Sequence, residues 1–351
     1  MINKKKLQTC FSLMIVIVIF FFMGGTIEAA TTQKLNKTSV LLKVGKTVQL
    51  SIDNASQIKW SSKKESIATV DQNGLVTGKK AGATTITATI HNKQYQCKIQ
   101  VYQVNTGNKE IDKKMTAVIK SEIKPSMNTI QKIKAIHDWI ILNCEYDYDN
   151  YLNGTIPTES YTMQGLLLKG RAVCAGYTQT FSEFMRSLGI ACKEVSGTGN
   201  GGNHAWNMVK VNGKWSWIDV TWDDPVPDTK GQILYNYFML SDKELKKDHW
   251  WTSGNLPTCN TKQSEYYEKI VQICNSEKEF FKLLDKQYQA GKNKLTVYMK
   301  KSMLDKLIIN AKQDFFVTCK NYGVPLLKYN MTYGNYMGDI IKLEFEFSAQ
   351  D

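Results

Sequence analysis

Cys174, His204 and Asp219 are the residues of this chain whose types and spacing could carry out covalent chemistry. Cys174 stands directly before a run of large apolar residues at helical spacing, and Gly189 is well placed to end that helix. The apolar residues are Tyr177, Phe181, Phe184, Met185 and Leu188. The positive end of a helix dipole favours a thiolate, which is the nucleophilic form of cysteine. A buried structural cysteine could occupy the same place, so the thiol alone does not decide the question.

The histidine and the aspartate lie on the two arms of a predicted hairpin. Alternating runs flank the Asn-Gly pair at 212–213, the strongest short signal for a two-residue type I′ turn. That turn sets the register, with His204 opposite Thr221 and Trp206 opposite Asp219. His204 and Asp219 then become diagonal neighbours on one face, at about 7–8 Å between backbones, which an imidazole and a carboxylate can bridge.

The three side chains would form a complete set if the helix carrying Cys174 packs against that face of the hairpin. The thiol is then the nucleophile, the imidazole carries the proton, and the carboxylate fixes the tautomer of the imidazole. The geometry therefore predicts nucleophilic chemistry on a carbonyl group.

Three sequence blocks around these residues resemble the transglutaminase-like superfamily of papain-type cysteine enzymes. The blocks are VCAGYTQTFSEFMRSLGI, NHAWNMV and WSWIDVTWDD. In that family Cys, His and Asp follow one another in this chain order, and the resemblance covers about residues 130–225. It implies that Cys174 is the nucleophile, His204 the general acid/base and Asp219 its partner. It also implies an α+β core, in which the helix bearing the cysteine packs against an antiparallel sheet.

An enzyme of this kind must stabilise the oxyanion that forms when the thiolate attacks. The backbone N–H of Cys174 could donate one hydrogen bond to it. An aromatic or amide side chain upstream of the cysteine often supplies the second donor in the family, and Tyr161 and Gln164 are both candidates here.

The residues around the predicted hairpin suggest what borders the site. Trp206 and Trp217 share the predicted face of the carboxylate and are candidate walls for substrate, whereas Trp222 is expected in the core. The stretch GTGNGG at 197–202 is small and polar, which favours an open rim that admits solvent. His249 lies outside the family blocks and is interpreted as a packing residue.

The segment before these blocks has the pattern of an all-β domain. Between residues 31 and 104 short alternating runs are separated by turn signals, which is typical of a β-sandwich. The motifs WSS, IATVD, NGLVTG and AGATTI resemble the bacterial immunoglobulin-like group 2 domain. The resemblance implies either a passive spacer or a unit that contacts an anionic cell wall or surface carbohydrate.

Residues 1–29 are predicted to be a signal peptide. Lys4, Lys5 and Lys6 precede an apolar run from 13 to 23, and small residues end the segment near Ala30. The apolar run is short for a bilayer span, which needs about 20 residues. We therefore expect export, to the cell surface or the medium, with membrane attachment only if this segment stays uncleaved.

The chain is strongly basic, with a formal net charge of +13 over 351 residues. Its lysines are scattered and its only arginines are Arg171 and Arg186, whereas proteins that read nucleic acids usually concentrate arginine. Nucleic acid is therefore not an expected partner. The charge favours an anionic wall or membrane surface, or simply confers solubility.

Metal and cofactor signals are absent from the sequence. The eight cysteines form no CxxC pair and no His/Cys spacing of the zinc type. Acyl transfer through a cysteine needs neither a metal nor an organic cofactor, so none is expected.

The chain is therefore expected to contain several domains with different folds. A signal peptide (1–29) and an all-β Ig-like sandwich (31–104) precede an α+β transglutaminase-like, papain-like core (112–255). A small α+β unit of unknown role (260–351) follows, because its pattern predicts a helix, a Gly-containing turn and strands. The core itself is expected to begin with two helices, the second of which carries His137 as a packed or solvated residue.

The expected function is acyl transfer by an exported cysteine enzyme that cleaves or exchanges amide bonds in peptides or proteins, with cell-wall peptides as natural candidates. A protease or amidase and a protein cross-linking transglutaminase use the same three residues, so both remain open. A third reading is a non-catalytic surface-binding protein that uses the fold as a scaffold.

Overall fold

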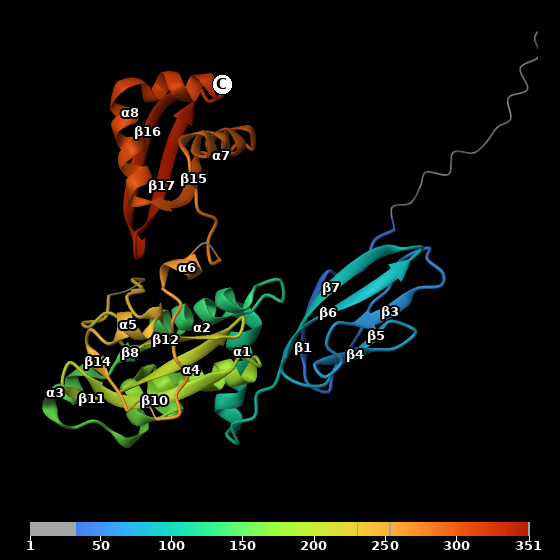
Figure 1. Cartoon of the computed structure of the whole chain (residues 1–351), viewed down its shortest axis with the longest axis vertical. Helices are drawn as coiled ribbons and strands as arrows, with labels where there is room; N and C mark the ends of the chain where they lie inside the picture. Colours follow the sequence, from blue (N-terminus) through green and yellow to red (C-terminus); the bar gives the residue numbers. More distant parts are fainter. Residues whose placement is uncertain (1–32, 230, 253, 268, 350–351) are drawn as a thin grey trace, which may run out of the picture.

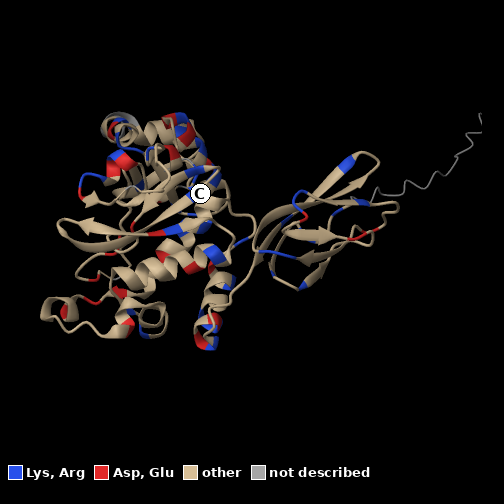
Figure 2. Ribbon diagram, turned by 60° about the horizontal axis from the view of Figure 1, so that its bottom comes forward, with Lys and Arg blue, Asp and Glu red and all other residues tan. Residues whose placement is uncertain are grey.

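The computed structural model describes residues 33–349 except 230, 253 and 268, so the predicted signal peptide lies outside the described residues. None of the helices in the described ranges combines the length and the apolar character that a membrane crossing would require. Figure 1 shows an N-terminal β-sandwich and a C-terminal unit on different sides of a central α+β unit. Lysine and arginine are spread over all these units, as Figure 2 shows, which agrees with the scattered pattern in the sequence.

The N-terminal unit is a sandwich of two sheets, as its alternating pattern predicts. One sheet has the order β1-β7-β6-β3 and the other the order β2-β5-β4. Alternate residues of the long strand β6 are buried, so one side of the strand faces the core between the sheets. The strands are β1 (Ser39–Lys43), β2 (Thr47–Gln49), β3 (Lys59–Ser62), β4 (Ala68–Val70), β5 (Leu75–Gly78), β6 (Gly82–Ile90) and β7 (Lys93–Tyr102).

The central unit begins with two amphipathic helices, α1 (Lys109–Glu122) and α2 (Thr129–Asn143), as predicted. The side chain of Asn108 caps α1, and Asn128 forms a capping box with Gln131 at the start of α2. Short elements lead from there to the helix that carries Cys174. They are β8 (Glu145–Tyr146), α3 (Tyr148–Asn153), the 3-10 turn η1 (Thr158–Tyr161), the π-helix η2 (Gly165–Lys169) and β9 (Arg171–Ala172).

Helix α4 (Cys174–Ser187) packs against the central antiparallel sheet, whose order is β13-β12-β11-β10-β14. All five apolar residues predicted for its buried face are at most 1% exposed. Gly189 ends the helix with a left-handed backbone, φ 72°, which glycine adopts at no steric cost. The sheet and its flanking helices are β10 (Cys192–Gly199), β11 (Gly202–Val211), β12 (Lys214–Ile218), β13 (Phe238–Leu240), α5 (Asp242–Leu245), β14 (His249–Trp250) and α6 (Ser264–Tyr267).

The C-terminal unit is α+β, as expected, and has a core of its own. Its sheet has the order β15-β17-β16, with α7 and α8 packed against it. The elements are α7 (Glu277–Gln289), β15 (Lys294–Lys300), α8 (Lys301–Asn321), β16 (Leu326–Met337) and β17 (Ile340–Ala349). Tyr266, Ile270 and Ile273 still pack into the core of the central unit, so that core draws on the chain beyond residue 255.

The sandwich is joined to the central unit through buried polar contacts. Gln100 of β7, 1% exposed, donates to the carbonyl of Leu188 just after α4 and accepts from the ammonium of Lys132 at 2.6 Å. Burial, with a smaller contribution from Lys98, lowers the pKa of Lys132 from 10.5 to about 8. The two units therefore share an interface that brings the pKa of a buried lysine close to neutral pH.

This lysine predicts a specific dependence of stability on pH. Between pH 8 and 10.5 the folded state holds Lys132 neutral while the unfolded chain keeps it protonated. Because the unfolded state then binds more protons, the free energy of unfolding should rise by about 1.6 kcal/mol from pH 8 to 9.5. Lys132→Met should remove that rise.

The measurement is urea unfolding of both proteins at several pH values in this window. Lys113→Met, at an exposed position of α1, is the matched control. Its free energy of unfolding should rise with pH as steeply as that of the natural chain. A parallel pH dependence in the Lys132→Met variant would contradict the assignment.

Candidate active site

Cys174 is the first residue of helix α4, where the sequence predicted it. The backbone N–H of Val173, just before the helix, donates to the carbonyl of Ser160 at 2.8 Å, which fixes the entry to the helix against η1. Cys174 is partly exposed, whereas the described cysteines other than Cys174 and Cys192 are buried. The thiol is therefore accessible at the end of the helix that favours negative charge.

His204 and Asp219 are in contact, with 2.6 Å between Nε2 and Oδ2. Cys174 lies near enough to His204 to raise the pKa of the imidazole. Because Nε2 is engaged by Asp219, Nδ1 is the nitrogen left for the thiol. The structure thus brings the three predicted residues together, with the imidazole between the thiol and the carboxylate.

The electrostatics of the pair are dominated by burial and by the opposite charges. Burial alone would lower the pKa of His204, but the Asp219 carboxylate and, to a lesser extent, Cys174 raise it to about 10. Burial would raise the pKa of Asp219, but His204 and His249 lower it to about 2. At neutral pH the pair is therefore an imidazolium and a carboxylate.

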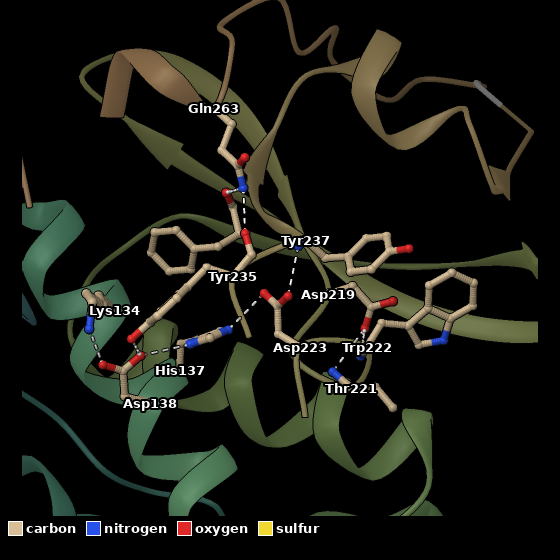
Figure 3. Close-up of polar contacts among 11 residues, drawn as sticks. Lys134, His137, Asp138, Asp219, Thr221, Trp222, Asp223, Tyr235, Tyr237 and Gln263 are labelled. Atoms are coloured by element: carbon tan, nitrogen blue, oxygen red, sulfur yellow. Dashed lines mark hydrogen bonds and ion pairs between the residues drawn. The ribbon is translucent and has the colours of Figure 1, made fainter. Parts of the chain in front are cut away.

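The hairpin register is confirmed near the turn and wrong beyond it. Positive φ angles at Asn212 and Gly213 agree with the type I′ turn, and the predicted pairing holds from Val211–Lys214 to Asn207–Ile218. At Ile218 the strand β12 ends, so the expected pairs of His204 with Thr221 and of Trp206 with Asp219 do not form. Asp219, the next residue, opens a turn. Its carboxylate Oδ1 accepts hydrogen bonds from the backbone N–H groups of Thr221 and Trp222, at 3.0 and 3.1 Å (Figure 3).

A second histidine contacts the same carboxylate and was interpreted from sequence as a packing residue. His249 of β14 is fully buried, and its Nε2 lies 3.1 Å from Oδ2 of Asp219. Its Nδ1 faces Asp248 at 2.6 Å. His249 therefore helps to hold Asp219 as well as packing, and no local pattern in the sequence pointed to that contact.

The tryptophans are arranged differently from the sequence prediction. Trp206 and Trp217 are each 1% exposed and belong to a core cluster, so they do not wall the site. Trp222 instead borders the pocket, with its ring centroid 5.0 Å from that of His204. Trp222 changes sides because Asp219 opens a turn and residues after the strand no longer alternate with the sheet. Trp206 and Trp217 precede that turn and are buried because Leu240 and Leu245 pack against their face of the sheet.

The two oxyanion candidates lie upstream of the cysteine. Tyr161 ends η1 and is 45% exposed, while Gln164 is exposed at the start of η2. Tyr146 of β8 was not predicted, yet Cys174 affects the pKa of its hydroxyl. Burial, followed by the charges of Cys174 and neighbouring tyrosines, raises its pKa.

A pocket of about 390 Å³ lies beside His204. Its walls include Tyr146, Trp222 and Asp224, together with glycines of the β10–β11 turn. That turn is an ordered hairpin, in which the backbone N–H of Asn200 donates to the carbonyl of Asp248. A Cβ at Gly199 would lie 2.7 Å from the Trp222 ring and 3.2 Å from His204, so glycine is required for this packing.

Among the described residues, one group of side chains could hold a metal ion: His204, Asp219 and His249, whose ligand atoms lie within 4.8 Å of one another. An ion there would occupy Nε2 of His204 and displace its hydrogen bond to Asp219. Metal binding would therefore compete with proton transfer through His204.

Comparisons with known proteins agree with the order of domains. A model of the transglutaminase-like superfamily matches residues 117–220, and a model of the bacterial Ig-like domain (group 2) matches residues 29–101. The chain therefore carries a transglutaminase-like domain behind a bacterial Ig-like domain.

Kyphoscoliosis peptidase of Mus musculus is 23% identical over 252 residues, 63% of this chain and 37% of that protein. The Homo sapiens protein is 24% identical over 237 residues, 59% and 35% of the respective chains. The chain spans little more than a third of the length of these relatives.

The crystal structure of a TGase matches 40% of this chain and 35% of its own, with 18% identity and a TM-score of 0.28. Domains 4 and 5 of the S-layer protein SbsC match 20% of this chain and 50% of their own, with 23% identity and a TM-score of 0.17.

The first prediction from this site concerns thiol reactivity. Cys174 should react with iodoacetamide at neutral pH at least ten times faster than the other described cysteines. Burial raises the pKa of Cys97 and Cys274 to about 11 and of Cys144, Cys192 and Cys319 to about 12, and also raises that of Cys259. Mass spectrometry of the modified sites as a function of time measures the rates.

Cys192 is the matched control because it is also partly exposed. Cys192→Ala should leave the fast phase of labelling in place, and Cys174→Ala should abolish it. Equal labelling of all sites in the folded protein would contradict the prediction.

The second prediction concerns the close packing at Gly199. Gly199→Ala should slow alkylation of Cys174 about ten-fold, because the added methyl group displaces Trp222 and His204. Gly202→Ala is the matched control, since its Cβ would meet only the Gly199 carbonyl, at 3.8 Å. A Gly199→Ala rate equal to that of Gly202→Ala would show that this packing does not position His204.

Proposed function

We propose that the central unit catalyses acyl transfer through a thioester on Cys174, cleaving amide bonds in peptides or proteins. The observation that carries the proposal is the placement of His204 between a partly exposed thiol and a buried carboxylate. The family match and the likeness to two peptidases support a cysteine enzyme.

In the first step the thiolate attacks the amide carbon and a C–S bond forms. The tetrahedral oxyanion can accept a hydrogen bond from the backbone N–H of Cys174 at the start of α4, and we assign the second donor to Tyr146, whose pKa responds to the charge of Cys174. The His204 imidazolium gives its proton to the departing amine as the C–N bond breaks. Tyr161 and Gln164 remain alternative donors.

In the second step a nucleophile must open the thioester. His204, now neutral, takes a proton from water as the oxygen attacks the thioester carbon, and the C–S bond breaks to restore the thiolate and the imidazolium. Gly202 and Asn203, at the rim of the pocket beside His204, are exposed to solvent. We therefore propose that hydrolysis predominates over transfer to an amine.

The Ig-like domain and the positive charge support a place of action at the bacterial surface. There the sandwich would hold the enzyme near an anionic wall or surface carbohydrate, and wall peptides or surface proteins would be the substrates.

Counting both products tests the division between hydrolysis and transfer. The full chain is incubated with glutamine-containing and wall-derived peptides in the presence of a labelled primary amine at millimolar concentration. Hydrolysis should exceed amine incorporation, and Cys174→Ala should yield neither product. Amine incorporation in excess would make the protein a cross-linking enzyme, and no product from any peptide would favour the scaffold function.

A further inference from the structure

Among the described residues, a buried carboxylate oxygen beside the proposed catalytic residues has no hydrogen-bond partner. Asp224, which lies just after the turn at Asp219, is 3% exposed and lines the pocket. Its Oδ2 accepts a hydrogen bond from the hydroxyl of Tyr177 on α4. Within the described part of the chain, no donor reaches its Oδ1. Because a buried polar atom without a hydrogen bond is costly, this oxygen is a place where a ligand would gain free energy.

Aromatic rings surround the rest of the pocket. Tyr146 and Tyr151 lie with ring centroids 6.0 Å apart, and Trp222 borders the side near His204. Tyr148 and Tyr151 are 42% and 54% exposed, which leaves large aromatic surfaces open at the rim. Aromatic faces attract cations, and a carboxylate among them adds an opposite charge.

The charges near Asp224 also favour a cation. Burial is the main cause that raises the pKa of Asp224 to about 7. The nearby carboxylates of Asp228 and Glu145 raise it further, whereas the hydrogen bond from Tyr177 and the charge of His137 lower it. A bound cation would offset that repulsion and stabilise the ionised carboxylate. The His204 imidazolium lines the same pocket, so Asp224 is the acidic end of a lining that carries both charges.

We propose that this pocket binds the ammonium group of a lysine-type side chain, held by Oδ1 of Asp224 and the faces of Tyr146 and Trp222. A volume of about 390 Å³ accommodates a side chain of this size with part of its peptide. An ammonium group paired with a carboxylate has no free lone pair, so it is a recognition group and not the attacking nucleophile. This specificity rests on the proposed function, since it selects peptides that carry a free ammonium group near the amide that is cleaved.

Ligand binding can be measured without any turnover. The full chain with Cys174→Ala is titrated with n-butylammonium and with 1-pentanol, a neutral ligand of similar size, and binding is followed by ligand-observed NMR. Butylammonium should bind at least ten-fold more tightly. Equal dissociation constants for the two ligands would overturn the proposal without the need for a variant at Asp224.

A charge-matched pair of variants then locates the site. Asp224→Asn in the same background should reduce the preference for butylammonium at least five-fold. Asp228→Asn removes an equal charge nearby but leaves the carboxylate of the pocket in place, so most of the preference should remain. A preference that survives Asp224→Asn in a folded protein would place the cation elsewhere and refute the assignment.

The two proposals can fail separately. With the natural thiol, a lysine-containing peptide should be hydrolysed with at least ten-fold higher kcat/KM than its norleucine counterpart. Equal values would contradict the lysine-type specificity while leaving acyl transfer intact. Asp224-dependent ammonium binding without hydrolysis of any peptide would support the binding site and reject the enzymatic activity.

Discussion

The buried carboxylate of Asp219 is the constraint around which the candidate active site is built. A charge in the protein interior is stable only when it is paired and fully hydrogen-bonded. Here one oxygen accepts two backbone N–H groups of its own turn, and the other faces His204 and His249. Those partners come from β11, from β14 and from the turn itself. Pairing the charge therefore fixes the relative positions of these segments, and with them the orientation of the imidazole toward the thiol.

A second buried ion pair, between Asp223 and His137, anchors the turn that carries Asp219. Asp223 accepts from the backbone N–H of Tyr237 at 2.8 Å and lies 3.1 Å from Nε2 of His137 on α2 (Figure 3). The other nitrogen of His137 faces Asp138, which also pairs with Lys134. Burial alone would lower the pKa of His137, but Asp138 and Asp223 raise it above its usual value. Helix α2 thus helps to hold, through Asp223, the turn that carries Asp219.

Sequence patterns predicted the parts of this structure that are periodic. The burial of Phe181 in α4 and the register next to Asn212 follow from spacing alone, because helices and type I′ hairpins repeat with fixed geometry. The contact of His249 with Asp219 joins residues 30 positions apart through β14, whose two residues are too few for a pattern. Trp222 was misplaced because alternation was extended past Ile218, where the strand ends. The partner of a buried charge depends on tertiary packing, which local periodicity does not encode.

The end of α4 at Gly189 has a mechanical consequence. A Cβ at this glycine would lie 2.3 Å from the carbonyl of Ala81, so the end of the helix rests directly on the sandwich. At the same contact, the backbone N–H of Gln103 donates to the carbonyl of Ser187, and the side-chain amide of Gln100 donates to the carbonyl of Leu188. Helix α4 has 14 residues and is about 21 Å long, with Cys174 at its other end. These contacts therefore couple the Ig-like domain mechanically to the end of the helix whose other end carries Cys174.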